Sequence, residues 1–83
     1  MGTNDIKNEI RKYIIETIVQ GNVDGIKNDT PLISGGIMDS ISTLKLVNFL
    51  EEKFSIEFHP HEVDRENLDS IDLIADFVES KLL

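Results

Sequence analysis

The stretch that decides the fold runs from residue 39 to residue 54 and has the sequence DSISTLKLVNFLEEKF. Apolar residues recur in it every three or four positions, which is the spacing of one face of an α-helix. We expect a helix from Asp39 or Ser40 to about Lys53, because Asp and Ser are favoured at helix starts. Its predicted inward stripe comprises Ile41, Leu44, Val47 and Leu50, with Phe54 closing the end and Leu46 and Phe49 widening the stripe.

The same spacing predicts a helix on each side of this stretch. The first runs from about Thr3 to Val19, with Thr3 or Asn4 as its cap, and Gly21 with Asn22 would end it. The last runs from about Ser70 to Leu82, with Asp69 or Ser70 as its cap. The predicted inward faces are Ile6, Ile10, Tyr13, Ile14 and Ile18 in the first helix and Ile71, Ile74, Ala75, Val78 and Leu82 in the last.

The connections complete an all-α domain. Residues 20–38 form a long first loop rich in glycine and asparagine, for which Leu32 and Ile33 are the expected anchors to the core. Residues 55–59 alternate polar and apolar side chains, but a lone strand would have no partner, so we expect an extended connector. Pro60 then opens a short helical turn that ends near Arg65. The prediction for residues 1–83 is one domain, a small four-helix bundle of three main helices and a short third helix.

Composition and charge narrow the possible functions. The 83 residues include no cysteine, which excludes disulfides, thiolate metal sites and cysteine nucleophiles. No apolar run approaches the ~20 residues that span a bilayer, and no secretory signal is visible, so a cytoplasmic protein is expected. The net charge is −8, and residues 29–80 hold twelve acids against three bases. Such a field repels nucleic acid and anionic lipid and favours basic protein partners.

The sequence contains no clear metal-binding or catalytic motif. His59 and His61 flank Pro60, but no further ligands stand at metal spacing, and residues 22–27 lack the order of oxygen ligands that calcium needs. A small hydrolase using Ser40 would need a base, and the sequence assigns none. No metal, no catalytic residue and no enzymatic activity are therefore expected.

The stretch that could carry chemistry is Ser34 to Ile41, SGGIMDSI. Its glycines allow a tight turn, and Asp39 and Ser40 then open a helix. An anion attached to the Ser40 oxygen would lie beside unpaired helical N–H groups and the positive end of the helix dipole. The plain alternative is that Asp39-Ser40 is a helix cap without chemistry.

The ordered set of motifs from residue 28 to residue 82 resembles the acyl carrier proteins. Asp39-Ser40-Ile41, the apolar stripe and the Glu51-Glu52-x-Phe54 ending are similar to the helix that bears the prosthetic group in that family. Residues 30–36, 56–60 and 66–71 resemble the family's first loop, its short connector and the start of its last helix. The resemblance implies that Ser40 receives phosphopantetheine from coenzyme A through a separate phosphopantetheinyl transferase. The arm would then carry an acyl thioester for the enzymes of lipid or fatty acid biosynthesis.

The resemblance also implies roles around Ser40. Asp39 matches the acid before the modified serine, and Ile41 would border the exit of the arm together with Ile37 and Met38. Acyl-activating ligases or synthases would dock on Glu51 and Glu52, again with Met38 and Ile37. The residues that would shelter an acyl chain are Val63 and Leu68, and a monomer is expected.

The chain departs from the family pattern in ways that leave alternatives open. Ser42 and Lys45 stand where members serving fatty acid synthesis usually have acids, and the spacing from Gly36 to Asp39 is one residue longer. These departures favour a specialised carrier over the housekeeping one. An aminoacyl or peptidyl carrier is one alternative. A helical docking module without a prosthetic group is another, in which Ser40→Ala would change only capping stability, by about 0.5–2 kcal/mol.

Overall fold

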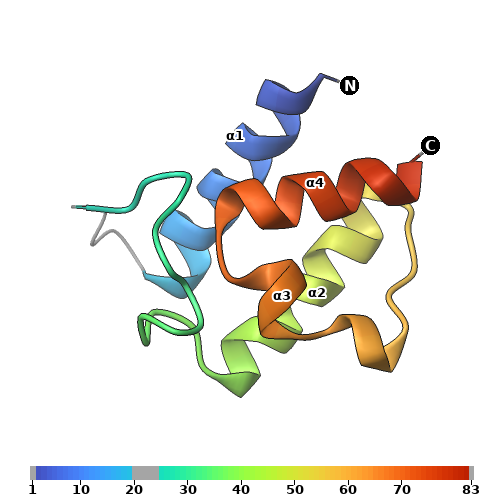
Figure 1. Ribbon diagram of the computed structural model, residues 1–83. Coiled ribbons are helices and arrows are strands. Elements are labelled where there is room, and N and C mark those ends of the chain that lie inside the picture. Colours follow the sequence, from blue (N-terminus) through green and yellow to red (C-terminus); the bar gives the residue numbers. More distant parts are fainter. Residues whose placement is uncertain (1, 20–24, 83) are drawn as a thin grey trace.

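The described part of the protein contains four α-helices, a π-helical segment and a 3-10 turn (Figure 1). The computed structural model describes residues 2–19 and 25–82. Within those ranges there is no strand, so the predicted all-α class and the small four-helix bundle are confirmed. In chain order the elements are α1 (Thr3–Tyr13), the π-helical segment η1 (Ile14–Ile18), α2 (Ser40–Phe54), the 3-10 turn η2 (Pro60–Glu62), α3 (Arg65–Leu68) and α4 (Ile71–Leu82).

The core is built around α4, which packs along α1. The inward residues predicted for α4 are fully buried: Ile71, Ile74, Ala75 and Val78. Leu82 is the exception, because it lies in the last turn and is exposed. An ion pair between Lys7 and Asp72, 2.9 Å long, and a hydrogen bond from the Thr3 hydroxyl to Glu79 join the two helices along their seam.

The first helix continues from α1 through η1, so the predicted helix is present almost to its expected end at Val19. Its N-cap is Gly2, which makes no side-chain cap, instead of the expected Thr3 or Asn4. Of its predicted inward face, Ile6, Ile10 and Ile14 are fully buried, while Tyr13 and Ile18 are half-buried. The predicted stop at Gly21 and Asn22 lies outside the described residues.

The orientation of α2 differs from the prediction. Leu46, Val47, Leu50 and Phe54 face the core, whereas Ile41 and Leu44 are 67% and 57% exposed. Residues two positions apart in a helix are rotated by about 200°, so Leu44 and Leu46 cannot both point inward. Burying Leu46 rotates the start of the predicted stripe out to solvent. The expectation that Ile41 and Leu44 are core residues is therefore wrong.

The described part of the first loop is held against the bundle by hydrogen bonds. The guanidinium of Arg11 donates to the Ile26 carbonyl and to the Asn28 side chain. The expected anchor Leu32 is fully buried, and its N–H donates to the carbonyl of Asp69 at 2.6 Å. These hydrogen bonds hold the described part of the loop against the bundle up to the start of α2.

The segment between α2 and α4 is more helical than predicted. Residues 56–59 form a connector without helix or strand, as expected. The short turn η2 begins at Pro60 as predicted, but α3 begins at Arg65, where the prediction had the helical turn end. The reason is Asp64, whose side chain accepts a hydrogen bond from the Asn67 N–H at 3.1 Å and so caps a new helix.

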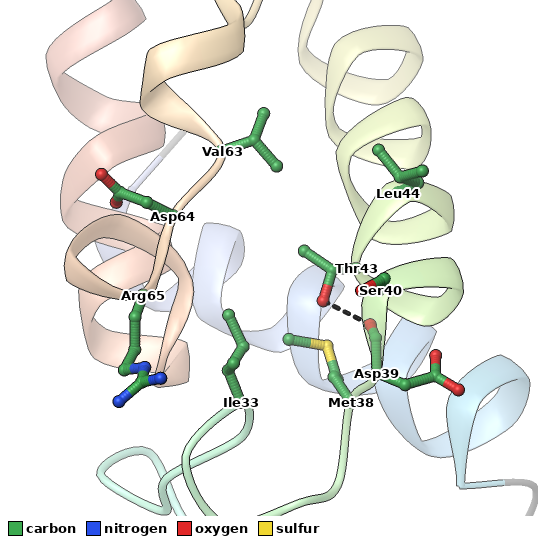
Figure 2. Close-up of a pocket in the computed structure, with 9 residues that line it drawn as sticks. All are labelled: Ile33, Met38, Asp39, Ser40, Thr43, Leu44, Val63, Asp64 and Arg65. Carbon is green, nitrogen blue, oxygen red and sulfur yellow. Dashed lines mark hydrogen bonds between the residues drawn. The ribbon is translucent and has the colours of Figure 1, made fainter.

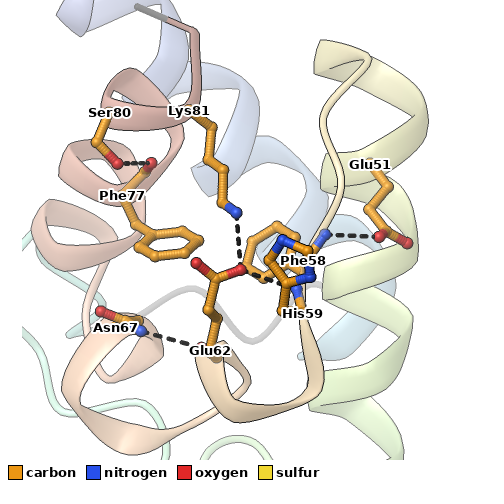
Figure 3. Close-up of polar contacts among 8 residues, drawn as sticks. All are labelled: Glu51, Phe58, His59, Glu62, Asn67, Phe77, Ser80 and Lys81. Carbon is orange, nitrogen blue, oxygen red and sulfur yellow. Dashed lines mark hydrogen bonds and ion pairs between the residues drawn. The ribbon is translucent and has the colours of Figure 1, made fainter.

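Glu62 ties the turn η2 to the end of α4 (Figure 3). Its carboxylate pairs with Lys81 at 2.7 Å and accepts a hydrogen bond from the His59 N–H at 2.8 Å. The same ammonium lies 5.3 Å from the centre of the Phe77 ring. Hydrogen bonding to Lys81, and then to the His59 backbone, holds the pKa of Glu62 below its ordinary value. These contacts hold the turn η2 against the C-terminal end of α4.

Across the ranges that the structure describes, no helix has the length and apolar character needed to cross a membrane.

Candidate functional site

Ser40 is the first residue of α2 and is exposed to solvent. The capping function belongs to its neighbour Asp39, whose carboxylate accepts a hydrogen bond from the Ser42 N–H at 2.8 Å. The Asp39 carbonyl accepts from both the N–H and the hydroxyl of Thr43, at 2.9 and 2.7 Å. Within the described residues the Ser40 hydroxyl makes no hydrogen bond. Asp39 therefore caps the helix without help from the Ser40 side chain, whose oxygen is exposed and has no partner among the described residues.

Asp39 is ionised beside that hydroxyl. Hydrogen bonding from the Ser42 backbone, and next from the Ser42 side chain, lowers the pKa of Asp39 below its ordinary value. A carboxylate whose pKa is lowered is a weak base at neutral pH. Asp39 therefore shapes the helix start and supplies negative charge, but it is poorly suited to activate Ser40 as a nucleophile.

A cavity of about 560 Å³ opens next to Ser40, between α2 and the segment that leads into α3 (Figure 2). Its apolar lining comes from the first loop, from α2 and from the residue after η2. Its polar lining lies at the starts of α2 and α3. The nine lining residues are Ile33, Met38, Asp39, Ser40, Thr43, Leu44, Val63, Asp64 and Arg65.

The structure separates the two residues predicted to form an acyl pocket. Val63 lines the cavity, and Figure 2 shows its side chain on the wall opposite Leu44. Leu68 is fully buried in the core and is not part of the cavity lining. The explanation is the unpredicted helix α3, which turns Leu68 toward the core, where α3 packs against α4.

The residues expected at the exit of the arm take three different positions. Met38 is only 2% exposed and faces the cavity, so it is not presented to solvent for docking. Ile37 is half-buried and packs against the core, and Ile41 is exposed beside Ser40 but outside the cavity lining.

Sequence reasoning missed several cavity residues. Leu44 lies four positions after Ser40, which places both on one helical face, and this spacing could have identified it. Ile33 was expected only as a core anchor of the loop, yet it also lines the cavity. Asp64 and Arg65 carried no recognisable motif.

The two acids expected to dock partner enzymes differ in their surroundings. The Glu51 carboxylate is half-buried and accepts a hydrogen bond from the Phe58 N–H at 2.9 Å, which holds the connector against α2 (Figure 3). Glu52 is exposed and makes no side-chain bond among the described residues. Glu52 is thus available to a partner, while Glu51 has a structural contact of its own.

The described residues contain no group of three or more histidine, cysteine or acidic side chains arranged to hold a metal ion. The rings of His59 and His61 stack with centroids 5.9 Å apart, and neither residue lines the cavity beside Ser40.

Comparison with known proteins defines the fold and leaves the function open. A scan against protein-family models finds no match to the chain. Among solved structures, a chain described as "Crystal structure of FAD-dependent dehydrogenase" matches with a TM-score of 0.76 and 23% sequence identity. The match covers 83% of this chain and 97% of that chain. At this identity the likeness shows that the helices share one arrangement, and a shared arrangement does not imply a shared activity.

Proposed function

We propose that this chain is a carrier protein of the acyl carrier kind and that Ser40 is where a phosphopantetheine arm is attached. The observation that carries the proposal is the state of Ser40. Its side chain is exposed at the start of α2, while Asp39 already performs the capping that would otherwise explain a serine there. The sequence resemblance of residues 39–54 to the helix that bears the prosthetic group supports the same assignment.

The attachment step needs a separate enzyme. The Ser40 oxygen would attack the phosphorus of coenzyme A that bears pantetheine, and the bond from that phosphorus to the bridging oxygen would break. Adenosine 3′,5′-bisphosphate would leave, and the hydroxyl proton would pass to a base of the transferase. Asp39, the carboxylate next to Ser40, is a poor acceptor for that proton because its pKa is lowered, and no histidine lines the cavity. On this proposal Ser40 is a substrate of the transferase, and the chain acts as a carrier and not as an enzyme.

The cavity beside Ser40 suits the arm and a short cargo. Its volume falls within the ~300–1,000 Å³ range of small-molecule sites. Its apolar wall comes from Met38, Leu44 and Val63 together with Ile33, and each buried methylene group would contribute about 0.8 kcal/mol. When attached, the arm supplies the thiol that holds an acyl group as a thioester, a group that the cysteine-free chain lacks.

The exposed face of α2 is suited to partner enzymes. Ile41 and Leu44 are large apolar side chains exposed beside Ser40, and Glu52 lies exposed further along the helix. A partner with an apolar patch and a basic residue would complement this face. The proposed partners are the phosphopantetheinyl transferase and the acyl-activating ligases or synthases of lipid biosynthesis, and the proposed location is the cytoplasm. Lys45, exposed on the same helix, favours a specialised carrier, and an aminoacyl or peptidyl cargo is the alternative.

The test is the intact mass of the purified protein after incubation with coenzyme A and a broad-range phosphopantetheinyl transferase. We expect wild type and the control variant Ser42→Ala to gain one phosphopantetheine and Ser40→Ala to gain none. Circular dichroism of each protein before incubation establishes that it is folded. A folded, initially unmodified wild type that gains no mass would overturn the proposal and leave a helical docking module.

A further inference from the structure

Arg65 is the only base among the nine residues that line the cavity. It is the first residue of α3, it is exposed, and it lies on the opposite side of the cavity from Ser40, which begins α2. In Figure 2 its guanidinium points away from Val63, toward the end of the cavity lined by Ile33. In the described parts of the chain its guanidinium forms neither a hydrogen bond nor an ion pair. A cation without a direct bond to a carboxylate is notable on a chain whose net charge is −8.

Three of the carboxylates on the segments around Arg65 already have donors. Asp39 and Asp64 accept hydrogen bonds from backbone N–H groups at the starts of α2 and α3. Asp69 accepts from the N–H groups of Ile33 and Ser34 and from the Ser34 hydroxyl. The positive charge of Arg65 contributes to the lowered pKa of Asp69, but no ion pair or hydrogen bond joins Arg65 to any of these three among the described residues. The N–H groups of its guanidinium therefore remain available to another anion.

A second argument comes from the charge of the cavity mouth. The lining carries two carboxylates, Asp39 and Asp64, against the single positive charge of Arg65. A phosphodiester on Ser40, or an acidic cargo, would add further negative charge at this mouth. Arg65 is the one lining residue that offsets it.

We propose that Arg65 binds an anionic group held over the cavity. This inference rests on the proposed carrier function and adds the chemistry of what the cavity holds. The anion is either the phosphodiester that joins the arm to Ser40 or a carboxylate at the far end of the acyl cargo. Both sources offer oxygen atoms to which a guanidinium can donate in pairs.

The experiment compares acyl forms of the holo protein that differ only in a terminal charge. Hexanoyl and adipoyl forms have cargoes of equal chain length, one ending in a methyl group and the other in a carboxylate. For each form we would record the Arg65 side-chain Nε–H signal by NMR, and the rate at which hydroxylamine cleaves the thioester. Rates are divided by those of the matching pantetheine thioesters, which removes intrinsic differences in reactivity. The variants are Arg65→Gln and the control Lys45→Gln, which removes an exposed base that does not line the cavity.

If the cargo carboxylate is the ligand, the adipoyl form reacts about two- to five-fold more slowly than the hexanoyl form, the effect of one exposed charge pair. Arg65→Gln abolishes this difference, and Lys45→Gln preserves it. If the phosphodiester is the ligand, the Arg65 signal shifts when the apo form becomes holo, equally with either cargo.

Two other outcomes would overturn the inference in distinguishable ways. An Arg65 signal that is the same in the apo, holo and both acyl forms, with equal normalised rates, would overturn it while the mass gain at Ser40 keeps the carrier function. Absence of that mass gain would overturn the carrier function and the inference with it.

Discussion

The carboxylate of Asp69 accepts hydrogen bonds from both the backbone N–H and the hydroxyl of Ser34, at 2.9 and 2.7 Å, although the two residues lie 35 positions apart. This contact joins the end of α3 to the loop that leads into α2. Ser40 lies only six residues after Ser34. The contact therefore holds in place the loop that leads directly to the candidate site.

Replacing Asp69 by Asn should loosen this loop. Burial by itself raises the pKa of Asp69, but the hydrogen bonds from Ser34 and Ile33 outweigh it, so the pKa lies below its ordinary value. Asp69→Asn removes the negative charge that accepts these hydrogen bonds. We expect the free energy of unfolding at pH 7 to fall by about 1–2 kcal/mol. The lower end of this range is expected because Ser34 is exposed and solvent screens the charge. Urea unfolding gives this value. Asp29→Asn, an exposed acid in the same loop, is the control and should change little.

The contribution of Asp69 should depend on pH in one direction. Because its pKa is lower in the folded protein than in the unfolded chain, its stabilisation is fully present above the unfolded value of about 3.9 and is lost as the pH falls through the folded pKa. The difference between wild type and Asp69→Asn should therefore shrink only in acid. A difference that stays constant from pH 7 down to pH 2 would contradict this assignment.

Gly35 should tolerate alanine poorly. A Cβ atom at this position would clash with the carbonyl oxygen of Pro31, a backbone atom that can move only with the loop. We expect Gly35→Ala to cost about 2 kcal/mol or more. Gly25→Ala is the matched control, because Gly25 has a left-handed φ of +86° but open space around it, and should cost about 1 kcal/mol. Thermal unfolding of both variants checks the order, and equal losses would refute the close contact.

The observed orientation of α2 predicts opposite results for two leucines. Leu46→Ala should cost about 2–5 kcal/mol, because Leu46 is fully buried. Leu44→Ala should change the free energy of unfolding by no more than about 0.5 kcal/mol, because the side chain is mostly exposed. On the carrier proposal, Leu44→Ala should nevertheless slow modification by the transferase. A larger destabilisation by Leu44→Ala than by Leu46→Ala would show that the helix has the other orientation.

Substitutions at Glu51 and Glu52 should have different effects, the first on stability and the second on the docking of partner enzymes. Glu51→Gln weakens the bond to the Phe58 N–H and should cost about 1 kcal/mol in urea unfolding. Glu52→Gln should leave stability unchanged and, if basic partners dock there, raise the KM of the transferase for the protein. The salt dependence of that KM should also decrease. Equal stability of the two variants would argue against the structural role of Glu51.

Much of the fold followed from the spacing of apolar residues. The faces of α1 and α4 were predictable because Ile6, Ile10, Ile71, Ile74 and Val78 leave one clear apolar stripe on each helix. In α2 the apolar residues cover too much of the surface for spacing alone to choose between Leu44 and Leu46. That choice depends on which face meets the rest of the bundle, and so it required the structure.

The candidate site was predictable in part. Ser40, Asp39 and Val63 were named from the resemblance to the acyl carrier proteins, and all three line one cavity in the structure. Arg65 was missed because α3 is only four residues long and begins at an aspartate cap that periodicity does not reveal. Leu68 was also named from the resemblance, but it is buried in the core and does not line the cavity, because the direction of a residue in a short helix depends on where that helix begins.

The most direct test of the central claim is to locate the modification by fragmentation mass spectrometry. Cleavage after lysine releases residues 28–45 as one peptide, which holds every other hydroxyl near the site: Thr30, Ser34, Ser42 and Thr43. After treatment with coenzyme A and transferase, we expect fragment ions that place one phosphopantetheine on Ser40. An unmodified peptide, or a group placed on any other residue, would contradict the account.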